Sequence, residues 1–284
     1  MFNRPLLVAA TLSTAALALL STGCTQLRAR DNLNKGVQAF KNAKYSEAVD
    51  HFKIAVELDP TFTPARLYLA TAYMTQYIPG AESPENKQNA QAAEDNFLEV
   101  LKIEANNKLA IQSLASLKYN QASGIPALED KLKKLDESRD WYVKLIQVDP
   151  SEKVGYYSLG VITWLKWYPK LMEARNKLHM KQEDPGPLKD KKLREDLKAN
   201  YETLVNEGIG HLKKALEIDK EYDDAMAYMN LLVRERADLL DNKEAYDKDI
   251  KEADEWVQKA LETKKMKAAR MPGNTGITQD EPAK

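Results

Sequence analysis

Apolar residues recur at helical spacing in the stretch from Tyr45 to Pro60, YSEAVDHFKIAVELDP. Ala48, Phe52 and Ala55 stand at positions i, i+4 and i+7, which places them on one face of a helix. Polar and charged residues fill most of the positions between them. Pro60 ends the pattern, because its ring cannot continue the helical hydrogen-bond ladder. The pattern therefore predicts a short amphipathic helix that buries one face.

A second helical run lies just upstream, with Leu33, Gly36, Val37 and Phe40 on one side. Gly36 has no side chain, so a neighbouring helix can approach closely at that point. Two short helices of this kind form a hairpin that cannot bury its apolar faces alone. We therefore expect further copies of the hairpin to stack on it.

Copies of the pattern recur along the chain. The residues equivalent to Ala55 follow one another at intervals of 45, 45, 70 and 45 positions, and they are Val100, Leu145, Ala215 and Ala260. An apolar residue stands three positions after each of them except the last, where Thr263 takes its place. Three equal intervals indicate a repeat architecture.

The first hairpin resembles a tetratricopeptide repeat (TPR), a unit of about 34 residues. The resemblance rests on Gly36, Phe40, Tyr45, Ala48, Phe52, Ala55 and Pro60. Lys35 departs from it, because Leu is usual at that position. The resemblance implies an all-α fold, a tetratricopeptide-type α-solenoid of about five helical hairpins. The longer interval of 45 residues implies that the later units have lengthened helices.

The implied solenoid covers residues 29–267, with units near 29–62, 63–107, 108–152, 153–222 and 223–267. The fourth unit exceeds its neighbours by 25 residues, which predicts an insertion between Trp164 and Gly208. Aromatic residues gather where the repeat is interrupted, at Trp164, Trp167 and Tyr168. Insertions in solenoids often mark a binding face. The alternative is that Trp164 and Trp167 fill a gap in the core.

Residues 1–24 have the pattern of a targeting segment, here a lipoprotein signal peptide. Arg4 gives a positively charged start, and residues 6–20 are apolar apart from three hydroxyl side chains. A membrane-spanning helix needs about 20 apolar residues, which makes it the weaker interpretation. The segment ends in LSTGC at 20–24, which resembles a bacterial lipobox, although the Leu stands four positions before the Cys instead of three.

The resemblance to lipoproteins implies that Cys24 carries acyl chains, which would hold the chain at a membrane. Cys24 is the only cysteine, so an internal disulfide is excluded. An ordinary secretion signal with an incidental cysteine is the alternative. Thr25 stands where Asp would direct a lipoprotein away from the outer membrane. We therefore expect a lipid-anchored protein of the bacterial cell envelope that faces the periplasm, with the outer membrane favoured.

Short segments are expected at either end of the solenoid. Residues 25–28 would form a brief tether, and residues 268–284 a disordered tail, because the tail is polar and aperiodic. Four basic residues, Lys264, Lys265, Lys267 and Arg270, precede most of the tail. They could contact anionic lipid or complement the dipole at the end of a helix.

The sequence offers little that indicates catalysis. Its three histidines are far apart, no cysteine cluster supplies metal ligands, and no glycine-rich loop is suited to phosphate. The 42 basic and 43 acidic residues nearly cancel, which gives no reason to expect nucleic acid as a partner. We therefore expect a protein that is not an enzyme and that has no metal or other cofactor; the oligomeric state is left open.

The resemblance implies a scaffold whose first helices line a groove for a protein or peptide partner. Carried over by repeat position, the groove would include Met74, Tyr119, Tyr157, Val161, Trp164, Trp167, Tyr168, Leu231 and Arg234. An alternative is a periplasmic small-molecule-binding component, such as one associated with a transporter, in which Trp164, Trp167 and Tyr168 form a closed pocket. A hydrolase with an unrecognised site is a third hypothesis.

Overall fold

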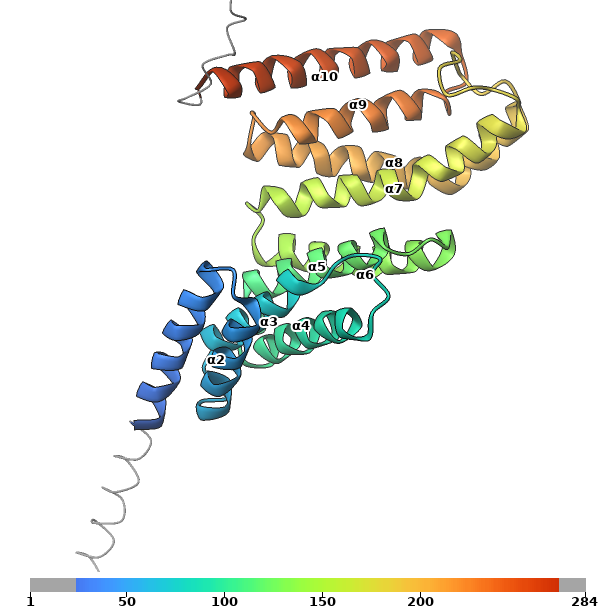
Figure 1. Ribbon diagram of the computed structural model, residues 1–284. Helices are drawn as coiled ribbons and strands as arrows, with labels where there is room; N and C mark the ends of the chain where they lie inside the picture. The colour runs from blue at the N-terminus through green and yellow to red at the C-terminus, as the bar shows by residue number, and fades with distance from the viewer. Residues whose placement is uncertain (1–23, 271–284) are drawn as a thin grey trace, which may run out of the picture. The chain divides into compact units, whose positions relative to one another are not determined.

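The computed structural model describes residues 24–270, in which every regular element is an α-helix. The chain divides into two compact units, one that ends at Trp141 and one that begins at Tyr142. Within each unit, Figure 1 shows successive helices that reverse direction and lie side by side. The residues outside 24–270, which include the predicted signal peptide up to residue 23, lie outside the described part.

The first unit is a series of helices joined by short turns. They are the helix over 24–41, α2 (Tyr45–Leu58), α3 (Thr63–Gln76), α4 (Pro84–Ile103), α5 (Lys108–Ser123) and the start of α6 (Leu128–Val148). In this unit α3 packs against α2 and α4, and α5 packs against α4. Each helix therefore contacts its neighbours in sequence, as expected for stacked hairpins.

The second unit contains the end of α6 and four longer helices. They are α7 (Lys153–Lys177), α8 (Lys191–Ile218), α9 (Asp223–Ala237) and α10 (Lys243–Arg270). Here α7 packs against α8 and α9, α8 packs against α9, and α9 packs against α10 (Figure 1). The predicted all-α fold of helical hairpins, with lengthened helices and an insertion in the fourth, is confirmed. The predicted units begin at 63, 108, 153 and 223, which are the first residues of α3, α5, α7 and α9.

Aspartates fix the turns between successive hairpins. The Oδ1 atoms of Asp59, Asp149 and Asp219 accept hydrogen bonds from the backbone N–H two residues later, at 3.1, 3.0 and 2.9 Å. Each aspartate directly follows a second helix of a hairpin. A short side chain that bonds its own turn in this way favours a reversal of the chain.

Small residues allow the helices of a hairpin to approach each other. A Cβ on Gly36 would lie 2.4 Å from the ring of Phe52, and one on Gly160 would lie 2.4 Å from Leu212. Phe52 and Leu212 occupy the same repeat position on the second helix, and both are fully buried. The fold therefore uses one small residue on the first helix to admit one large residue from the second.

The insertion lengthens both helices of the fourth hairpin. α7 has 25 residues and α8 has 28, and a connection over residues 178–190 joins them. α8 continues without interruption from Lys191, with Asp190 as its N-cap, into the part that follows the repeat. The extra residues are therefore extensions of the hairpin and its loop, with no additional domain.

The described ends differ from the predicted segments. Residues 25–28, predicted as a tether, belong to the helix over 24–41, and residues 268–270, predicted as tail, are the last residues of α10. Lys267 forms an ion pair with Asp223, and Arg270 forms one with Glu221 at 2.7 Å. These two cations thus join the end of α10 to the start of α9 and the turn before it.

Among the helices of residues 24–270, none combines the length and the apolar character that crossing a bilayer requires.

Candidate binding surface

Five aromatic side chains form a connected row on the first helices of the last two hairpins. Tyr157, Trp164 and Tyr168 come from α7, where their spacing of 7 and 4 residues places them on one face. Tyr228 comes from α9, and Tyr222 is the residue before α9. We call these five residues the aromatic row.

The rings of the row form a continuous series of contacts, in the order Tyr222, Tyr157, Tyr228, Trp164 and Tyr168. Tyr157 lies 4.9 Å from Tyr222 and 5.8 Å from Tyr228, measured between ring centroids. Tyr228 lies 5.7 Å from Trp164, edge to face, and Trp164 stacks on Tyr168 at 5.0 Å. These are favourable distances for aromatic pairs. All five side chains are half-buried, so each also presents part of its ring to solvent.

A half-buried glutamate with an enclosed carboxylate oxygen fixes the orientation of Trp164. The indole Nε1–H donates to Oε1 of Glu235 at 2.8 Å, while Oε2 of Glu235 is buried without a hydrogen-bond partner in the structure. Burial, opposed by the hydrogen bond from Trp164 and by Arg175 and assisted by the nearby Asp238, raises the pKa of Glu235 to about 8. Glu235 is therefore mostly protonated at neutral pH, so the row adjoins a neutral acid.

Charged groups lie at the Tyr222 end of the row. Lys153 places its Nζ 5.0 Å from the centroid of the Tyr222 ring and 2.6 Å from Oδ2 of Asp219. Burial, with smaller contributions from Asp224 and Asp219, raises the pKa of Tyr222 to about 12. The phenol therefore stays protonated and can donate a hydrogen bond at any physiological pH.

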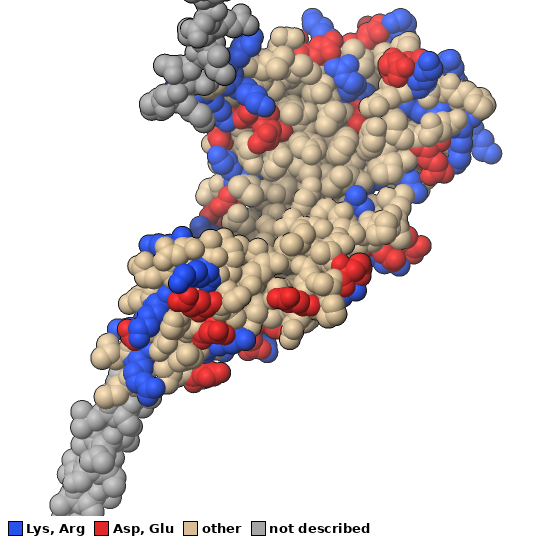
Figure 2. Space-filling view, in the orientation of Figure 1, with Lys and Arg blue, Asp and Glu red and all other residues tan. Residues whose placement is uncertain are grey.

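The surface around the first helices of this unit is mostly uncharged. In Figure 2, the part of the second unit between α7 and α9 is largely free of Lys, Arg, Asp and Glu, which gather along α10 and near the α7–α8 connection. Half-buried aromatic rings on an uncharged surface supply contact area at low conformational cost, and such residues dominate protein recognition.

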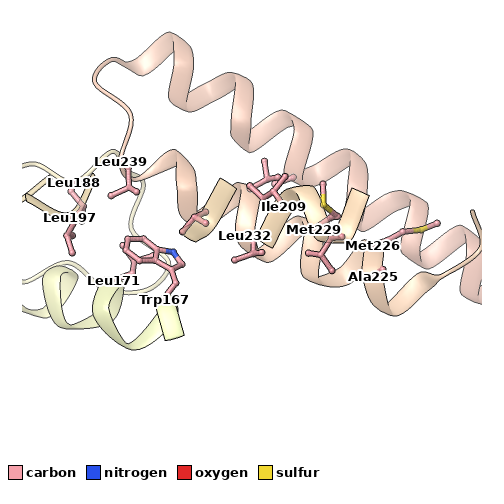
Figure 3. Close-up of a cluster of buried hydrophobic side chains, with 14 of the residues drawn as sticks. Trp167, Leu171, Leu188, Leu197, Ile209, Ala225, Met226, Met229, Leu232 and Leu239 are labelled. Carbon is pink, nitrogen blue, oxygen red and sulfur yellow. The ribbon is translucent and has the colours of Figure 1, made fainter. Parts of the chain in front are cut away.

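Trp167 and Val161 were predicted to line the groove, and that prediction is wrong. Trp167 is 0% exposed and Val161 is 5% exposed. Figure 3 shows Trp167 in the interior, near Leu171 and Leu239. A side chain without accessible surface lines no cavity that admits water. Trp167 therefore fills the core, and it cannot form a closed pocket with Trp164 and Tyr168.

The remaining predicted groove residues fall into two groups. In the second unit, Leu231 and Arg234 are half-buried on α9, and Arg234 is held by Asp254 at 2.5 Å and by Asn230. Met74 and Tyr119 belong to the first unit, where both are half-buried on α3 and α5. The structure thus brings Tyr157, Trp164 and Tyr168 together, while Met74 and Tyr119 lie in a separate compact unit.

Sequence reasoning missed two members of the row, Tyr222 and Tyr228. Tyr222 stands immediately before a first helix, and the equivalent residue before α3 is Phe62. An aromatic residue at the same turn of two units is the signal that could have drawn attention to it.

Within residues 24–270, no group of three or more His, Cys, Asp or Glu side chains is placed to hold a metal ion.

Hairpins in this register, each stacked on the next within a unit, give the chain an all-α solenoid fold of the tetratricopeptide type. Stacked repeats of this class form extended concave surfaces that bind other molecules. A small residue on the first helix, a large residue on the second helix and an aspartate in the following turn recur in several hairpins. This recurrence indicates the class from the chain itself.

Comparison with solved structures finds chains of similar fold. A crystal structure of MamA protein has a TM-score of 0.50 at 13% identity, with 86% of this chain and 95% of that chain covered. The MamA RS-1 ArsTM double mutant has a TM-score of 0.50 at 15% identity, covering 85% and 97%. YrrB, described as a TPR protein with an unusual peptide-binding site, has a TM-score of 0.43 at 14% identity, covering 84% and 91%. At these identities the similarity concerns the fold.

No family model matches the sequence. No curated protein sequence matches it either.

Proposed function

We propose that this protein is a non-catalytic scaffold that binds a protein or peptide partner on its aromatic row. The observation that carries the proposal is the row itself. Its rings are half-buried and in contact with one another, and charged side chains lie at its Tyr222 end. A rigid aromatic surface can bury area in a complex without having to order its own side chains first.

The type of surface favours a macromolecular partner over a small molecule. A small-molecule site is a concavity that encloses most of its ligand. The predicted enclosed pocket required Trp167, whose side chain belongs to the core. The accessible part of the row, from Tyr222 to Tyr168, extends along two helices, a form that suits an extended segment or a helix of another protein.

The proposal includes a lipid anchor at Cys24. The residue is exposed in the structure and is the only cysteine of the chain. The apolar leader before it and the small residues that flank it support lipidation, and Thr25 supports the outer membrane of a bacterial cell envelope. Cys24 belongs to the helix over 24–41, so the anchor would be attached to the first helix of the first hairpin.

The anchor is tested by replacing Cys24 with Ser in the full-length chain. We expect metabolic labelling with palmitate to be lost and the protein to leave the membrane fraction, because stable anchoring requires the acyl chains. Labelling that persists in the Cys24→Ser variant would contradict the lipid anchor.

Partner binding is tested by crosslinking and affinity capture from native membranes with the wild type and a Tyr157→Ala/Tyr168→Ala variant. We expect a stoichiometric protein neighbour whose recovery falls at least about tenfold in the variant, since truncating central aromatic contacts costs about 1–2 kcal/mol or more each. Circular dichroism shows whether both proteins are folded.

The matched control is Tyr68→Ala, which removes an exposed tyrosine of α3 outside the row. This variant should capture the same neighbour as the wild type. Equal recovery with the double variant would contradict the row as the binding surface, and co-purification of a small molecule in place of a protein would favour the other class.

A further inference from the structure

A hairpin that is followed by another helix of its unit forms a groove between its two helices, and that helix fills the groove. Within the two units this is seen for α3, α5 and α9. Each inserts three residues: a small one, Leu or Met four positions later, and an apolar one three positions after that. They are Ala65, Leu69 and Ala72 in α3, Ala110, Leu114 and Leu117 in α5, and Ala225, Met229 and Leu232 in α9. All nine are buried. We call this pattern the insertion trio.

The groove that receives each trio is lined by two residues of the preceding second helix. These pairs are Phe52 and Ala55, Phe97 and Val100, and Leu212 and Ala215. All six have no exposed surface. Phe97 and Val100 share a buried cluster with the trio of α5, and Leu212 and Ala215 share one with the trio of α9. Phe52 shares a cluster with Leu69 and Ala72 of α3. The groove positions are thus buried wherever a further helix of the chain covers them.

The last hairpin has the same groove with nothing of the described chain in it. Val257 and Ala260 stand at the two lining positions and are half-buried, and the next apolar residue, Leu261, is 49% exposed. Leu216, at the position equivalent to Leu261, is 9% exposed. These side chains and Ala227 of α9 line an open depression of about 250 Å³. We call it the terminal groove.

The first helix of the chain lacks the trio that fills such grooves. Its equivalent residues are Asp31, Lys35 and Gln38, and all three are polar. Asp31 and Lys35 pair with each other at 2.7 Å on the surface. The start of the array is therefore closed by polar side chains, as terminal repeats require for solubility, whereas its other end presents apolar ones. A second copy could not supply its first helix to the terminal groove without burying these charges.

We propose that the terminal groove binds an amphipathic α-helix of a partner protein, one that carries the insertion trio. The occupant is a helix because every equivalent groove within the units holds one. Residues 271–284 of the chain contain Pro272, Gly276 and Pro282, which disfavour a helix, and they contain no complete trio. The rim carries Asp224 on one side and Lys264 on the other, so a bound helix would present a cation beside α9 and an anion beside α10.

This site is separate from the proposed partner surface. The groove residues Val257, Ala260 and Leu261 are not members of the aromatic row, and α10 contributes nothing to the row. Either site can therefore fail its test without affecting the other.

The test uses helix-stapled, fluorescently labelled peptides with the sequences of α3, α5 and α9 as probes, because each already fills an equivalent groove. Binding to the full-length protein is followed by fluorescence anisotropy. The control peptide is the α9 sequence with Ala225→Asp, Met229→Lys and Leu232→Gln, which copies the polar positions of the first helix. We expect at least one of the three probes to bind and the control peptide to bind at least about tenfold more weakly.

Two variants of the protein locate the binding. Leu261→Asp places a carboxylate in the groove and should weaken the probe at least about tenfold. Met266→Asp is the matched control, because Met266 is 46% exposed on the same helix and does not line the groove. It should leave affinity unchanged.

Four outcomes would overturn the proposal, three of them with the full-length chain and one with a truncated chain. The first is that no probe binds. The second is that binding survives Leu261→Asp. The third is that the wild type self-associates on sedimentation and Leu261→Asp makes it monomeric, because a second copy would then be the occupant. Deletion of residues 271–284 should not change the affinity, and a large increase would instead identify the tail as the occupant.

Discussion

The α7–α8 hairpin consists of two regions that are stabilised by different kinds of contact. Near its start the hairpin follows the repeat, with Gly160 facing Leu212 and Gly208 facing Thr163. A Cβ added to Gly160 would lie 2.4 Å from Leu212, and one added to Gly208 would lie 2.5 Å from Thr163. Toward the α7–α8 connection the repeat ends, and contacts between buried polar groups join the apolar packing of Trp167, Leu171 and Leu188. The first region is built by a rule used in several units, and the second by contacts that occur once.

Arg175 is the centre of the second region. Its guanidinium donates from Nε and Nη2 to the two carboxylate oxygens of Asp238, at 2.7 and 3.0 Å, and from Nη1 to the carbonyl oxygens of Lys181 and Asp184. Both members of the ion pair are buried. One side chain of α7 thereby holds both the connection and the residue that follows α9.

Further hydrogen bonds close the connection. The N–H of Gly186 donates to the hydroxyl of Tyr246 at 2.9 Å, and Arg194 donates to the carbonyl oxygen of Leu188 at 2.6 Å. These partners come from α8 and α10. Apolar spacing therefore sets how the helices stack, whereas single buried polar residues fix the path of the inserted loop.

The largest effect is expected for Arg175→Ala. The substitution leaves the buried carboxylate of Asp238 without its partner, and breaking a buried pair in this way costs about 3–5 kcal/mol of unfolding free energy. Burial already raises the pKa of Asp238 against the effect of Arg175. The variant should therefore recover stability as the pH falls, because protonation removes the unpaired charge. Urea unfolding at several pH values measures both effects.

Lys177→Ala is the matched control for this prediction. Lys177 lies two residues further along α7, is exposed and pairs with Glu173 at 2.8 Å. Exposed pairs at this spacing contribute about 0.3–0.5 kcal/mol. If Arg175→Ala cost no more than Lys177→Ala, the inserted region would not depend on its buried ion pair.

The second prediction concerns Glu235 of α9, which accepts a hydrogen bond from Trp164 of α7. Its folded-state pKa is about 8 and its unfolded-state pKa is near 4.3. The folded protein therefore binds one proton more than the unfolded chain between these values, so its stability is greatest at low pH and falls as the pH rises through this window. Glu235→Gln removes this proton but keeps an acceptor for Trp164.

The measurable quantity is the difference in unfolding free energy between Glu235→Gln and the wild type. Between pH 5 and pH 7, we expect the unfolding free energy of the variant to rise by about 2–3 kcal/mol relative to that of the wild type. The slope is about 1.4 kcal/mol per pH unit. A difference that does not change with pH would show that Glu235 ionises freely. Trp164→Phe should extend the window to higher pH, because the Trp164 hydrogen bond lowers the pKa of Glu235.

The regular region could be predicted from the sequence, because the same residues recur in it. Ala55, Val100 and Ala215 were recognised as equivalent from their spacing, and all three are fully buried. The prediction of a helical-hairpin fold with an insertion in the fourth unit rested on such positions. Repetition tells which face of a helix is inside even when no neighbouring element is known.

The site could be predicted only in part, because it lies where the repetition ends. Trp164 and Trp167 are three residues apart on α7, and in the repeat pattern both are simply large aromatic residues. Trp167 became a core residue because the inserted turns bring Leu188 and Leu197 of the lengthened hairpin into the same cluster. Glu235 gave no signal at all, since burial of a single carboxylate follows from packing between helices that are distant in sequence.

The smallest effect tests the rule of the regular region by substituting two glycines. Gly160→Ala gains about 1 kcal/mol from helix propensity but inserts a methyl group 2.4 Å from Leu212, and overpacking of this kind costs about 1–3 kcal/mol. Gly210 lies on α8, where an added Cβ would meet no atom within 4 Å, so Gly210→Ala should gain the propensity without the clash. We expect urea unfolding to show that Gly160→Ala destabilises by about 1 kcal/mol, while Gly210→Ala stabilises by about 0.5–1 kcal/mol. Equal shifts in the same direction would mean that the close approach of α7 and α8 is not required, and the small-to-large pairing would lose its role as the rule that positions the helices.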